Sequence, residues 1–469
     1  MTPNESDPEV RESRLWGGRV STGPAPALDR LNRSLPFDHR LGPFEIEIDR
    51  AWVDELARVG AIEESEARQL QVGLDAVERR LEAGEPACEP DEDIHSLIER
   101  WLEEEVGVSA SQVRLGRSRN DVVATGGRMW ARDSAARSAL LVAELQDALL
   151  RVAEDEGGIP FPLYSHMQPA QPTRAANWLL SHFWALDRGR SRLADAVARA
   201  SELPLGAAAG AGTGIDVDRQ RLAVRLGFDT AGPNSLDAVG SRDWAAELLW
   251  AWTMIAIDLS RLAEDLVLYS SAEFGLLRFA DEWTTGSSLM PQKRNPDGAE
   301  LARAVGGSML GLLTGLLSTL KGLPSGYQKD LQEDKRALFA AFDRLAGVLE
   351  VLAGTVSSMR LHHDRAVASI DASVLASDLA ESLAEGGLPF RDAHEVVGRL
   401  VAKAEDLGVA LADLDDEQVR SIEPGLVESW ETRFDREAAL QRRGAIGGSS
   451  REAVGRQLSE ARKRLSERP

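Results

Sequence analysis

Apolar residues recur every three or four positions along most of the chain, and stretches that alternate between apolar and polar residues are few. This period is that of α-helices with an apolar face, so we predict an all-α fold. The clearest case runs from Asp243 to Phe274 without Pro or Gly and predicts one long helix. Three more long helices are predicted, over Ala135–Glu156, Ala175–Glu202 and Asp330–Met359. Four such helices can form a bundle.

The helix predicted from Asp243 is apolar on more than one side. Its large apolar side chains cannot all face a single neighbour: Trp244, Leu248, Leu249, Trp250, Trp252 and Met254. A helix of this kind must be buried, and we expect another copy of the chain to cover it in a homo-oligomer. The uncharged stretch between Arg303 and Lys321 is short for a membrane span, so we predict a buried core helix there.

Pro and Gly mark the breaks between helices. We predict a Pro-rich loop over Pro160–Pro172 and a flexible Gly/Ala connector over Leu203–Thr213. Thr284–Asp297 is a long loop inside otherwise helical sequence, and such loops tend to be functional. Three regions follow, namely an N-terminal helical domain (1–115), a central long-helix bundle with the loop 284–297 (116–365), and a small helical C-terminal domain (366–469).

Charge narrows the classes of partner. The net charge is −22 and the pI about 4.9, so nucleic acid and anionic membranes are not expected partners. A site for an anionic ligand must therefore concentrate positive charge locally. Cys88 is the single cysteine, which excludes an intramolecular disulfide, and Met1–Arg14 lacks the apolar core of a signal peptide. We expect a cytoplasmic protein without a Cys-based zinc site.

The long loop carries the first candidate chemistry. Its sequence from Gly286 is GSSLMPQKRNPD, in which Gly286 permits tight backbone geometry beside Ser287. Consecutive backbone amides in such a loop can bind an anion, and Lys293 and Asn295 add a charge and polar donors. Taken alone, the same residues could form an ordinary surface loop.

Two further segments carry charged or proton-transferring residues. The string GRSRND at Gly116–Asp121 offers arginine forks that match carboxylates, although a solvated turn before a helix would look similar. The string YSHMQPAQP at Tyr164–Pro172 places His166 in a Pro-flanked loop. Histidine is the usual proton-transfer residue near neutral pH, but a lone histidine is more often structural.

The last two segments resemble helix starts. In YQKDLQEDK at Tyr327–Lys335, Gln332 and Lys335 fall on one helical face, as in a binding site or an ordinary charged helix start. In DEDIH at Asp91–His95, the acidic residues could cap a helix that carries the histidine. Each segment alone is modest evidence, whereas their order along the chain is specific.

The ordered strings resemble a known family. GSSLMPQKRNPD closely resembles the signature of the fumarase/aspartase superfamily of elimination enzymes. The other strings are similar to those of the argininosuccinate lyase family, and the resemblance runs from about residue 15 to about residue 450. They are LWGGR at Leu15–Arg19, DEDIH, GRSRND, SHMQPAQP, NSLDAV at Asn234–Val239, YQKDLQEDK, and SDLAESLAEGGLPFRDAHEVVG at Ser377–Gly398.

The resemblance implies a fold, an assembly and a reaction. Three mostly helical domains are expected, with four subunits packing their bundles into one core and each active site built from three subunits. The reaction implied is the reversible β-elimination of argininosuccinate to arginine and fumarate, the last step of arginine biosynthesis, catalysed by a carbon–nitrogen lyase. A base removes the proton beside a carboxylate, and an acid protonates the departing guanidinium nitrogen. This scheme requires no metal or organic cofactor.

The resemblance also assigns roles to residues. Ser287 is the expected base, with a pKa lowered by the loop amides and by Lys293, and His166 is the expected general acid or orients it. Met290–Pro296 is expected to form a lid over the substrate. The positions that match the family's substrate-binding residues, or fit beside them, are Ser34, Asp93, His95, Arg119, Asn120, Ser165, Asn295, Tyr327, Gln332 and Lys335.

The sequence also departs from the family pattern. Leu115 and Val122 stand where Thr and Gln are usual, and Gly240-Ser241 replaces a usual Ser-Asp. Val305 and Ser308 occupy positions where Lys and Arg are common. Two other functions therefore stay open, namely a related lyase that releases fumarate from another succinyl-amine substrate and a non-catalytic structural homologue.

Overall fold

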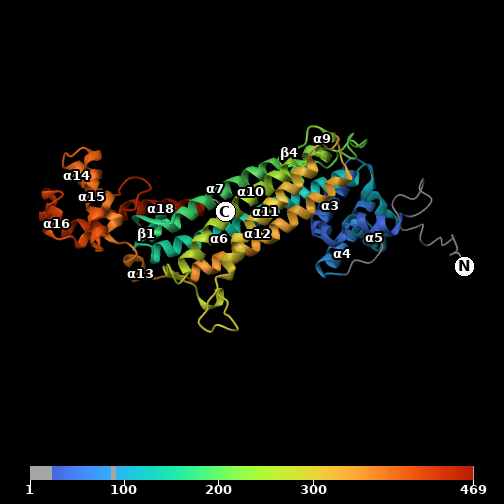
Figure 1. The fold of residues 1–469 in the computed structure, drawn as a ribbon. Coiled ribbons are helices and arrows are strands. Elements are labelled where there is room, and N and C mark those ends of the chain that lie inside the picture. The colour runs from blue at the N-terminus through green and yellow to red at the C-terminus, as the bar shows by residue number, and fades with distance from the viewer. Residues whose placement is uncertain (1–23, 86–90, 468–469) are drawn as a thin grey trace. The chain divides into compact units, whose positions relative to one another are not determined.

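The computed structural model describes residues 24–85 and 91–467 (Figure 1). The chain divides into two compact units. One unit comprises the chain up to Ala136 with Ala194–Trp250 and Gly311–Phe342, and the second comprises Arg137–Leu193, Ala251–Leu310 and Asp343 onward. The LWGGR string and Cys88 lie outside the described residues. The division into three domains stays a prediction.

Five long helices supply segments to both units. They are α6 (Arg119–Asp155), α7 (Ala175–Arg199), α10 (Asp243–Ser270), α11 (Asp297–Leu320) and α12 (Glu333–Ser358). The four predicted long helices are confirmed, but α6 begins well before Ala135. It continues through Gly126 and Gly127 because packing outweighs the poor helix propensity of glycine; a Cβ on Gly127 would touch the buried Trp244 ring at 3.5 Å.

The first unit packs short helices around buried Trp52 and Trp101. The helices α3, α4 and α5 contact one another. Asp93 caps the start of α5, because its carboxylate accepts the Ser96 N–H. Its elements are α1 (Pro26–Asn32), α2 (Leu35–Asp38), η2 (His39–Leu41), α3 (Gly42–Arg58), α4 (Glu64–Glu82), α5 (Ile94–Val106), η3 (Gly107–Arg114), β3 (Glu202–Leu203), α8 (Arg219–Arg225), β4 (Thr230–Ala231), α9 (Ser235–Gly240) and η5 (Lys329–Gln332).

The second unit combines bundle segments with the C-terminal helices. Apolar side chains of α14 and α15, with Trp430, form a core of their own. Its further elements are β1 (Pro160–Ser165), β2 (Gln168–Arg174), β5 (Leu277–Arg278), η4 (Asp281–Trp283), β6 (Arg360–Leu361), α13 (His363–Ala368), η6 (Ala372–Leu375), α14 (Ala376–Glu385), α15 (Phe390–Leu407), η7 (Leu411–Asp413), α16 (Asp416–Arg420), η8 (Pro424–Ser429), η9 (Glu431–Phe434), α17 (Arg436–Gln441) and α18 (Arg451–Glu467).

Burial within the single chain differs from the prediction for two apolar helices. The helix α10 is largely buried within its own chain, so another copy is not needed to cover it; Trp250, 43% exposed, is its main exception. The apolar helix α11 was predicted to be a buried core helix. In the single chain, however, only 22% of its most apolar 18-residue stretch is buried. By length and composition alone, α11 could cross a membrane. Periodicity cannot tell which of two apolar helices lies at the centre of a bundle.

Two predicted loops also differ from the structure. The Pro-rich loop predicted over Pro160–Pro172 is instead part of the antiparallel hairpin β1–β2, which runs from Pro160 to Arg174 and is closed by a two-residue turn. The connector from Leu203, expected to be flexible, is buried through Ala207. The Asp121 carboxylate fixes it by accepting the N–H groups of Gly206 at 2.9 Å and Ala208 at 2.8 Å. Proline spacing and glycine content do not reveal such long-range partners.

Candidate active site

Some predicted site residues lie in the first unit and the others in the second. Ser34 is the first of those in the first unit along the chain. The Ser34 hydroxyl donates to Asp38 Oδ2 at 2.5 Å, and the other carboxylate oxygen accepts the Ile94 N–H at 3.1 Å. Asp38 is buried, and burial raises the pKa of its carboxyl. Asp38 thus links Ser34 to the start of α5. Asp38 was not predicted as a site residue, although its position one helical turn after Ser34 was an available signal.

Asp93 and His95 lie at the start of α5 on buried ion pairs. His95 Nδ1 lies 3.0 Å from Glu45 Oε2, and the side chains are 9% and 5% exposed. Burial opposes the charge on both groups, but their attraction outweighs it. The attraction between the two charges therefore raises the pKa of His95 and lowers the pKa of Glu45. Glu45, on α3, was also missed, because nothing in its local sequence indicates a partner on α5.

The charged side chains of Gly116–Asp121 contact three different parts of the chain. Arg117 pairs with the buried Asp49 at 2.5 Å, and Arg119 pairs with Asp93 at 3.0 Å while donating to Ser96 Oγ at 3.3 Å. Asp121 turns inward to the connector, and burial raises its pKa to about 6. The interpretation of this string as a solvated turn is therefore wrong for Arg117 and Asp121. Asn120 lies half-buried in the first turn of α6.

A cavity of about 350 Å³ opens beside these ion pairs. Its polar lining includes Glu45, Asp49, His95, Arg117 and Arg119, and its apolar lining comes from α5 and η3. Arg119, which is one-third exposed, keeps part of its guanidinium accessible despite its pairing with Asp93. The cavity can therefore present positive charge to a carboxylate.

Tyr327, Gln332 and Lys335 lie around the start of α12. Tyr327 packs against Ala207, Ala238 and Val239, and burial raises the pKa of its phenol. Gln332 Nε2 donates to the carbonyl oxygen of Asn32 at 3.3 Å, next to Ser34. Lys335 Nζ donates to Asp334 at 2.9 Å. Gln332 ends the short helix η5, so it does not share a continuous helix with Lys335 as predicted.

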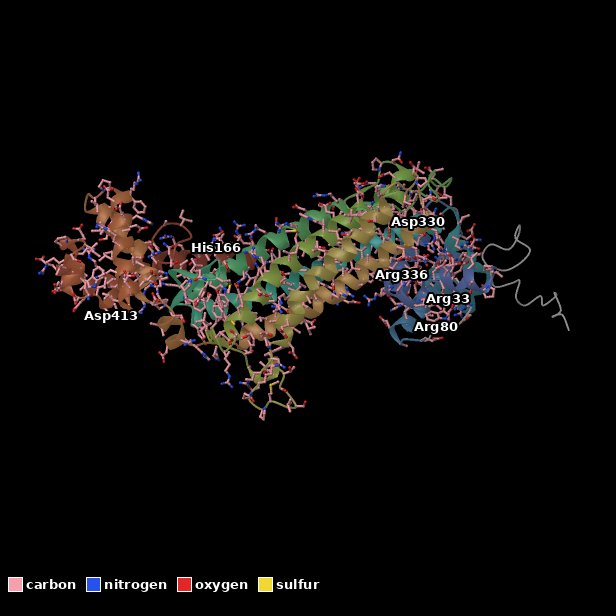
Figure 2. All side chains as sticks on the ribbon, viewed as in Figure 1. Arg33, Arg80, His166, Asp330, Arg336 and Asp413 are labelled. Atoms are coloured by element: carbon pink, nitrogen blue, oxygen red, sulfur yellow. The ribbon has the colours of Figure 1, made fainter. Side chains whose placement is uncertain are left out.

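The second group begins with the tip of the β1–β2 hairpin. Ser165, His166, Met167 and Gln168 are exposed there, and His166 is labelled in Figure 2. His166 and Met167 have φ values of 53° and 60°, the left-handed geometry that non-glycine residues adopt at an energetic cost. Positive φ values at both central residues are typical of a two-residue type I′ hairpin turn. The imidazole of His166 is exposed to solvent at this turn.

The loop 284–296 is a narrow-stemmed excursion between η4 and α11 (Figure 1). Thr285 and Asn295 pair across the stem through two backbone hydrogen bonds of 3.2 and 2.8 Å. Within the loop, Ser287 Oγ accepts the N–H groups of Leu289 at 3.3 Å and Met290 at 3.1 Å. Donors of this kind stabilise a negative charge on the oxygen. Lys293 is exposed and forms no ion pair with any described residue.

The structure brings together some predicted residues and not others. Asp93, His95 and Arg119 form one group of charges, and Gln332 donates to Asn32, two residues before Ser34. Lys335 instead contacts Asp334. Within the second unit, no hydrogen bond among described residues joins His166 to Ser287 or Lys293. No group of three His, Cys, Asp or Glu side chains in the described chain is placed to hold a metal ion.

The positions that depart from the family pattern have structural partners. The Leu115 carbonyl accepts the Trp52 indole N–H at 3.0 Å, and Val122 lines the cavity. Gly240 packs on Gly326, where an added Cβ would lie 2.9 Å from a backbone oxygen. Ser241 accepts a hydrogen bond from the buried Arg128. Nothing in the single chain explains the departures on α11, Val305 and Ser308.

Comparison with known proteins places the chain among lyases. Residues 18–311 match the family described as Lyase, and residues 373–441 match the argininosuccinate lyase C-terminal family. The chain is 47% identical to the argininosuccinate lyase of Roseiflexus sp. (strain RS-1), over 97% of this chain and 100% of that protein. It is 44% identical to that of Frankia casuarinae, over 96% and 97% of the two chains.

Solved structures share the fold. EDDS lyase in complex with formate has a TM-score of 0.82 at 25% identity, covering 96% of this chain and 92% of that one. Class II fumarase from Schistosoma mansoni has a TM-score of 0.72 at 16% identity, covering 86% and 91%. The predicted all-helical architecture with a central bundle is confirmed.

Proposed function

The chain belongs to the argininosuccinate lyase family, and on this premise we propose that it cleaves argininosuccinate to arginine and fumarate, with Ser287 as the base. The observation that carries the role of Ser287 is its hydrogen bonding. Its Oγ accepts two backbone N–H groups in the loop after Gly286, which favour the alkoxide form. An alkoxide is basic enough to take a proton from the carbon beside a carboxylate.

The elimination then needs an acid and a site for negative charge. Loss of the proton spreads charge onto the neighbouring carboxylate, which preorganised donors must stabilise. Lys293 and Asn295 in the same loop are suited to this role. His166 protonates the departing guanidinium nitrogen or orients the group that does so, and Ser165 binds substrate beside it.

The first unit supplies the remaining substrate contacts. Arg119 offers a partly accessible guanidinium to a substrate carboxylate, and Lys335 offers an ammonium. Ser34, Asn120, Tyr327 and Gln332 supply neutral hydrogen-bonding groups. Asp93 and His95 complete the wall through the ion pairs that hold Arg119 and Glu45.

We propose that several subunits share each site within a homotetramer. The exposed apolar face of α11 supports assembly, because Leu301, Leu310 and Leu317 are 67, 48 and 50% exposed in the single chain. Gly307, Gly311 and Gly315 recur four residues apart on α11 with no atom within 4 Å of an added Cβ, which leaves room for a closely packed helix. An assembled core, rather than a membrane, would cover this helix in a cytoplasmic enzyme.

The test is an assay of the purified protein with argininosuccinate. Ultraviolet absorbance follows fumarate, and chromatography confirms arginine. Ser287→Ala should reduce turnover at least about 100-fold, because general-base catalysis contributes about 10²–10⁴-fold. Ser288→Ala is the matched control, since the Ser288 hydroxyl is exposed and makes no hydrogen bond among the described residues. Equal turnover in both variants would remove Ser287 from the role of base.

A second candidate function follows from the departures on α11. Val305 and Ser308 lack the charges common in the family, so a different succinyl-amine could be the substrate. If the wild-type protein releases no fumarate from argininosuccinate, adenylosuccinate and aspartate are the next substrates to test. Absence of product from all three would favour a non-catalytic structural homologue.

A further inference from the structure

A buried cluster of charges lies behind Lys335 in the first unit. Lys335 Nζ donates to Asp334 Oδ1 at 2.9 Å, and Arg242 Nε donates to Asp334 Oδ2 at 2.5 Å. The three side chains are between 1 and 8% exposed. One carboxylate therefore serves two cations.

Arg128 extends this cluster with a third cation. Its Nη2 donates to Ser241 Oγ at 3.0 Å and its Nη1 to the Arg199 carbonyl at 3.3 Å, while Arg242 Nη1 donates to the Ser241 carbonyl at 2.8 Å. Arg128 is 4% exposed, and its Nε atom is buried without a hydrogen-bond partner. No carboxylate in the described chain forms an ion pair with Arg128.

The charge on Arg128 persists at neutral pH. Burial, assisted by the neighbouring Arg242, lowers the pKa of its guanidinium to about 10. The cluster thus holds three cations and one carboxylate, all buried, in a chain whose net charge is −22. Charges removed from water are screened much less than surface charges, so this excess acts over several ångströms.

We propose that Arg128 is a positioning residue whose charge, which no ion pair neutralises, raises the affinity of the Lys335 end of the site for a substrate carboxylate. Ser241 is a neutral partner, so the Arg128 charge has no ion pair, although Asp243, Glu202 and Asp237 favour it from farther away. The contacts through Ser241, Arg242 and Asp334 connect Arg128 to Lys335. The inference rests on the proposed function, because that function assigns Lys335 to substrate binding.

The experiment compares Ser241→Asp with Ser241→Asn, two side chains of nearly equal size that differ by one charge. Ser241→Asp should raise KM for argininosuccinate about fivefold, the scale of one buried unit charge acting across part of a site. It should leave kcat within about twofold, because no reacting atom is touched. It should also raise the thermal midpoint by pairing Arg128. Ser241→Asn should keep KM near the wild-type value.

A stabilised Ser241→Asp protein whose KM equals that of Ser241→Asn would overturn the proposal, since Arg128 would then be only structural. If Ser241→Asp does not fold, KM for argininosuccinate is compared between Arg128→Lys and Arg128→Met instead. The lysine variant should keep the wild-type KM and the methionine variant should raise it, whereas equal values in the two variants would contradict the inference.

Binding of fumarate separates this inference from the proposed function. The rise in thermal midpoint on adding fumarate, a dicarboxylate, requires no turnover. A smaller rise in Ser241→Asp than in Ser241→Asn would support the inference even if the wild-type protein did not cleave argininosuccinate. Equal rises would count against it even in an active enzyme.

Discussion

Two carboxylates one helical turn apart on α3, Glu45 and Asp49, line the cavity and pair with basic side chains there. Glu45 pairs with His95 and Asp49 with Arg117, and all four side chains are less than one-tenth exposed. Removing one member of a buried ion pair leaves the other charge uncompensated, which is more costly than losing a surface pair. These residues therefore fix the position of α5 and of the Gly116–Asp121 string.

The Glu45–His95 pair predicts a pH dependence of stability. The raised pKa of His95 means that its stabilising effect is full below about pH 6.5 and is lost as the pH rises through its folded-state pKa. The lowered pKa of Glu45 means that its effect is full above about pH 4.5 and is lost on acidification. His95→Gln should lower the free energy of unfolding by about 3 kcal/mol near pH 6 and less near pH 9.

Urea denaturation at the two pH values, at one protein concentration, measures this difference. The exposed His394 supplies the control, because His394→Gln removes a histidine without a buried partner. An equal loss of stability at pH 6 and pH 9 in His95→Gln would show that the pair is not charged at the lower pH.

At the scale of elements, the loop 284–296 is anchored at both ends on α12. Trp283 packs flat on Gly354, where an added Cβ would overlap the indole ring, and Gly298 lies against Val351. The ion pair of Arg294 with Asp281 and the hydrogen bond of Thr285 with Asp297 close the stem. These contacts fit the expected role of Met290–Pro296 as a lid, which stays a prediction.

Gly354→Ala should displace Trp283 and loosen this base. Overpacking of this kind costs about 1–3 kcal/mol, and we expect turnover to fall several-fold with faster tryptic cleavage after Lys293 and Arg294. Gly347→Ala on the same helix is the matched control, since nothing lies within 4 Å of its added Cβ. The control should be neutral or stabilising. Identical proteolysis rates in the two variants would exclude Trp283 as the anchor.

The exposed face of α11 predicts a defect of assembly rather than of folding. Gly311→Leu adds a side chain on the exposed face of α11, where nothing in the chain lies within 4 Å of an added Cβ. This side chain would separate closely packed helices of neighbouring subunits. We expect a smaller particle by light scattering after size exclusion, with unchanged helical circular dichroism. Gly398→Leu, on the exposed side of α15, should keep the wild-type assembly. A tetrameric Gly311→Leu protein would remove α11 from the interface.

At the scale of the whole molecule, the candidate site is distributed. One unit contains Ser34, Arg119 and Lys335, and the other contains His166 and Ser287. The proposed sharing of sites between subunits would account for the lack of a hydrogen bond between His166 and the Ser287 loop among the described residues. It also gives each subunit two incomplete halves, which a mixing experiment can combine.

Mixing inactive His166→Asn and Ser287→Ala proteins under subunit exchange should restore activity. With random mixing in equal amounts, about a quarter of sites receive both intact elements, because the hairpin and the loop come from different subunits. The control mixture of Ser287→Ala and Lys293→Ala should stay inactive, since both changes lie in one loop. No recovery in the first mixture, with exchange proven by mass spectrometry, would contradict shared sites.

The sequence by itself determined the helices, the loop and the family. A helical period is a local property, so the ranges of α7, α10 and α12 followed from it within a few residues. The loop at Thr284 followed from its Gly and Pro residues, and the ordered strings identified the chemistry. The bounds of α6 and the hairpin at Pro160 did not follow, because tertiary packing and strand pairing outweigh local propensity there.

Only the tertiary structure decided which charges face one another. Glu45, Asp38 and Asp49 carry no local sign of their roles, because their partners lie far along the chain on other elements. The same holds for Arg128, whose hydrogen-bond partners, the Ser241 hydroxyl and the Arg199 carbonyl, are neutral groups on segments far along the chain. Burial of α10 and exposure of α11 were also decided by packing, since both helices are apolar enough for either place. Pair energies depend on distance and burial, which are properties of the folded chain.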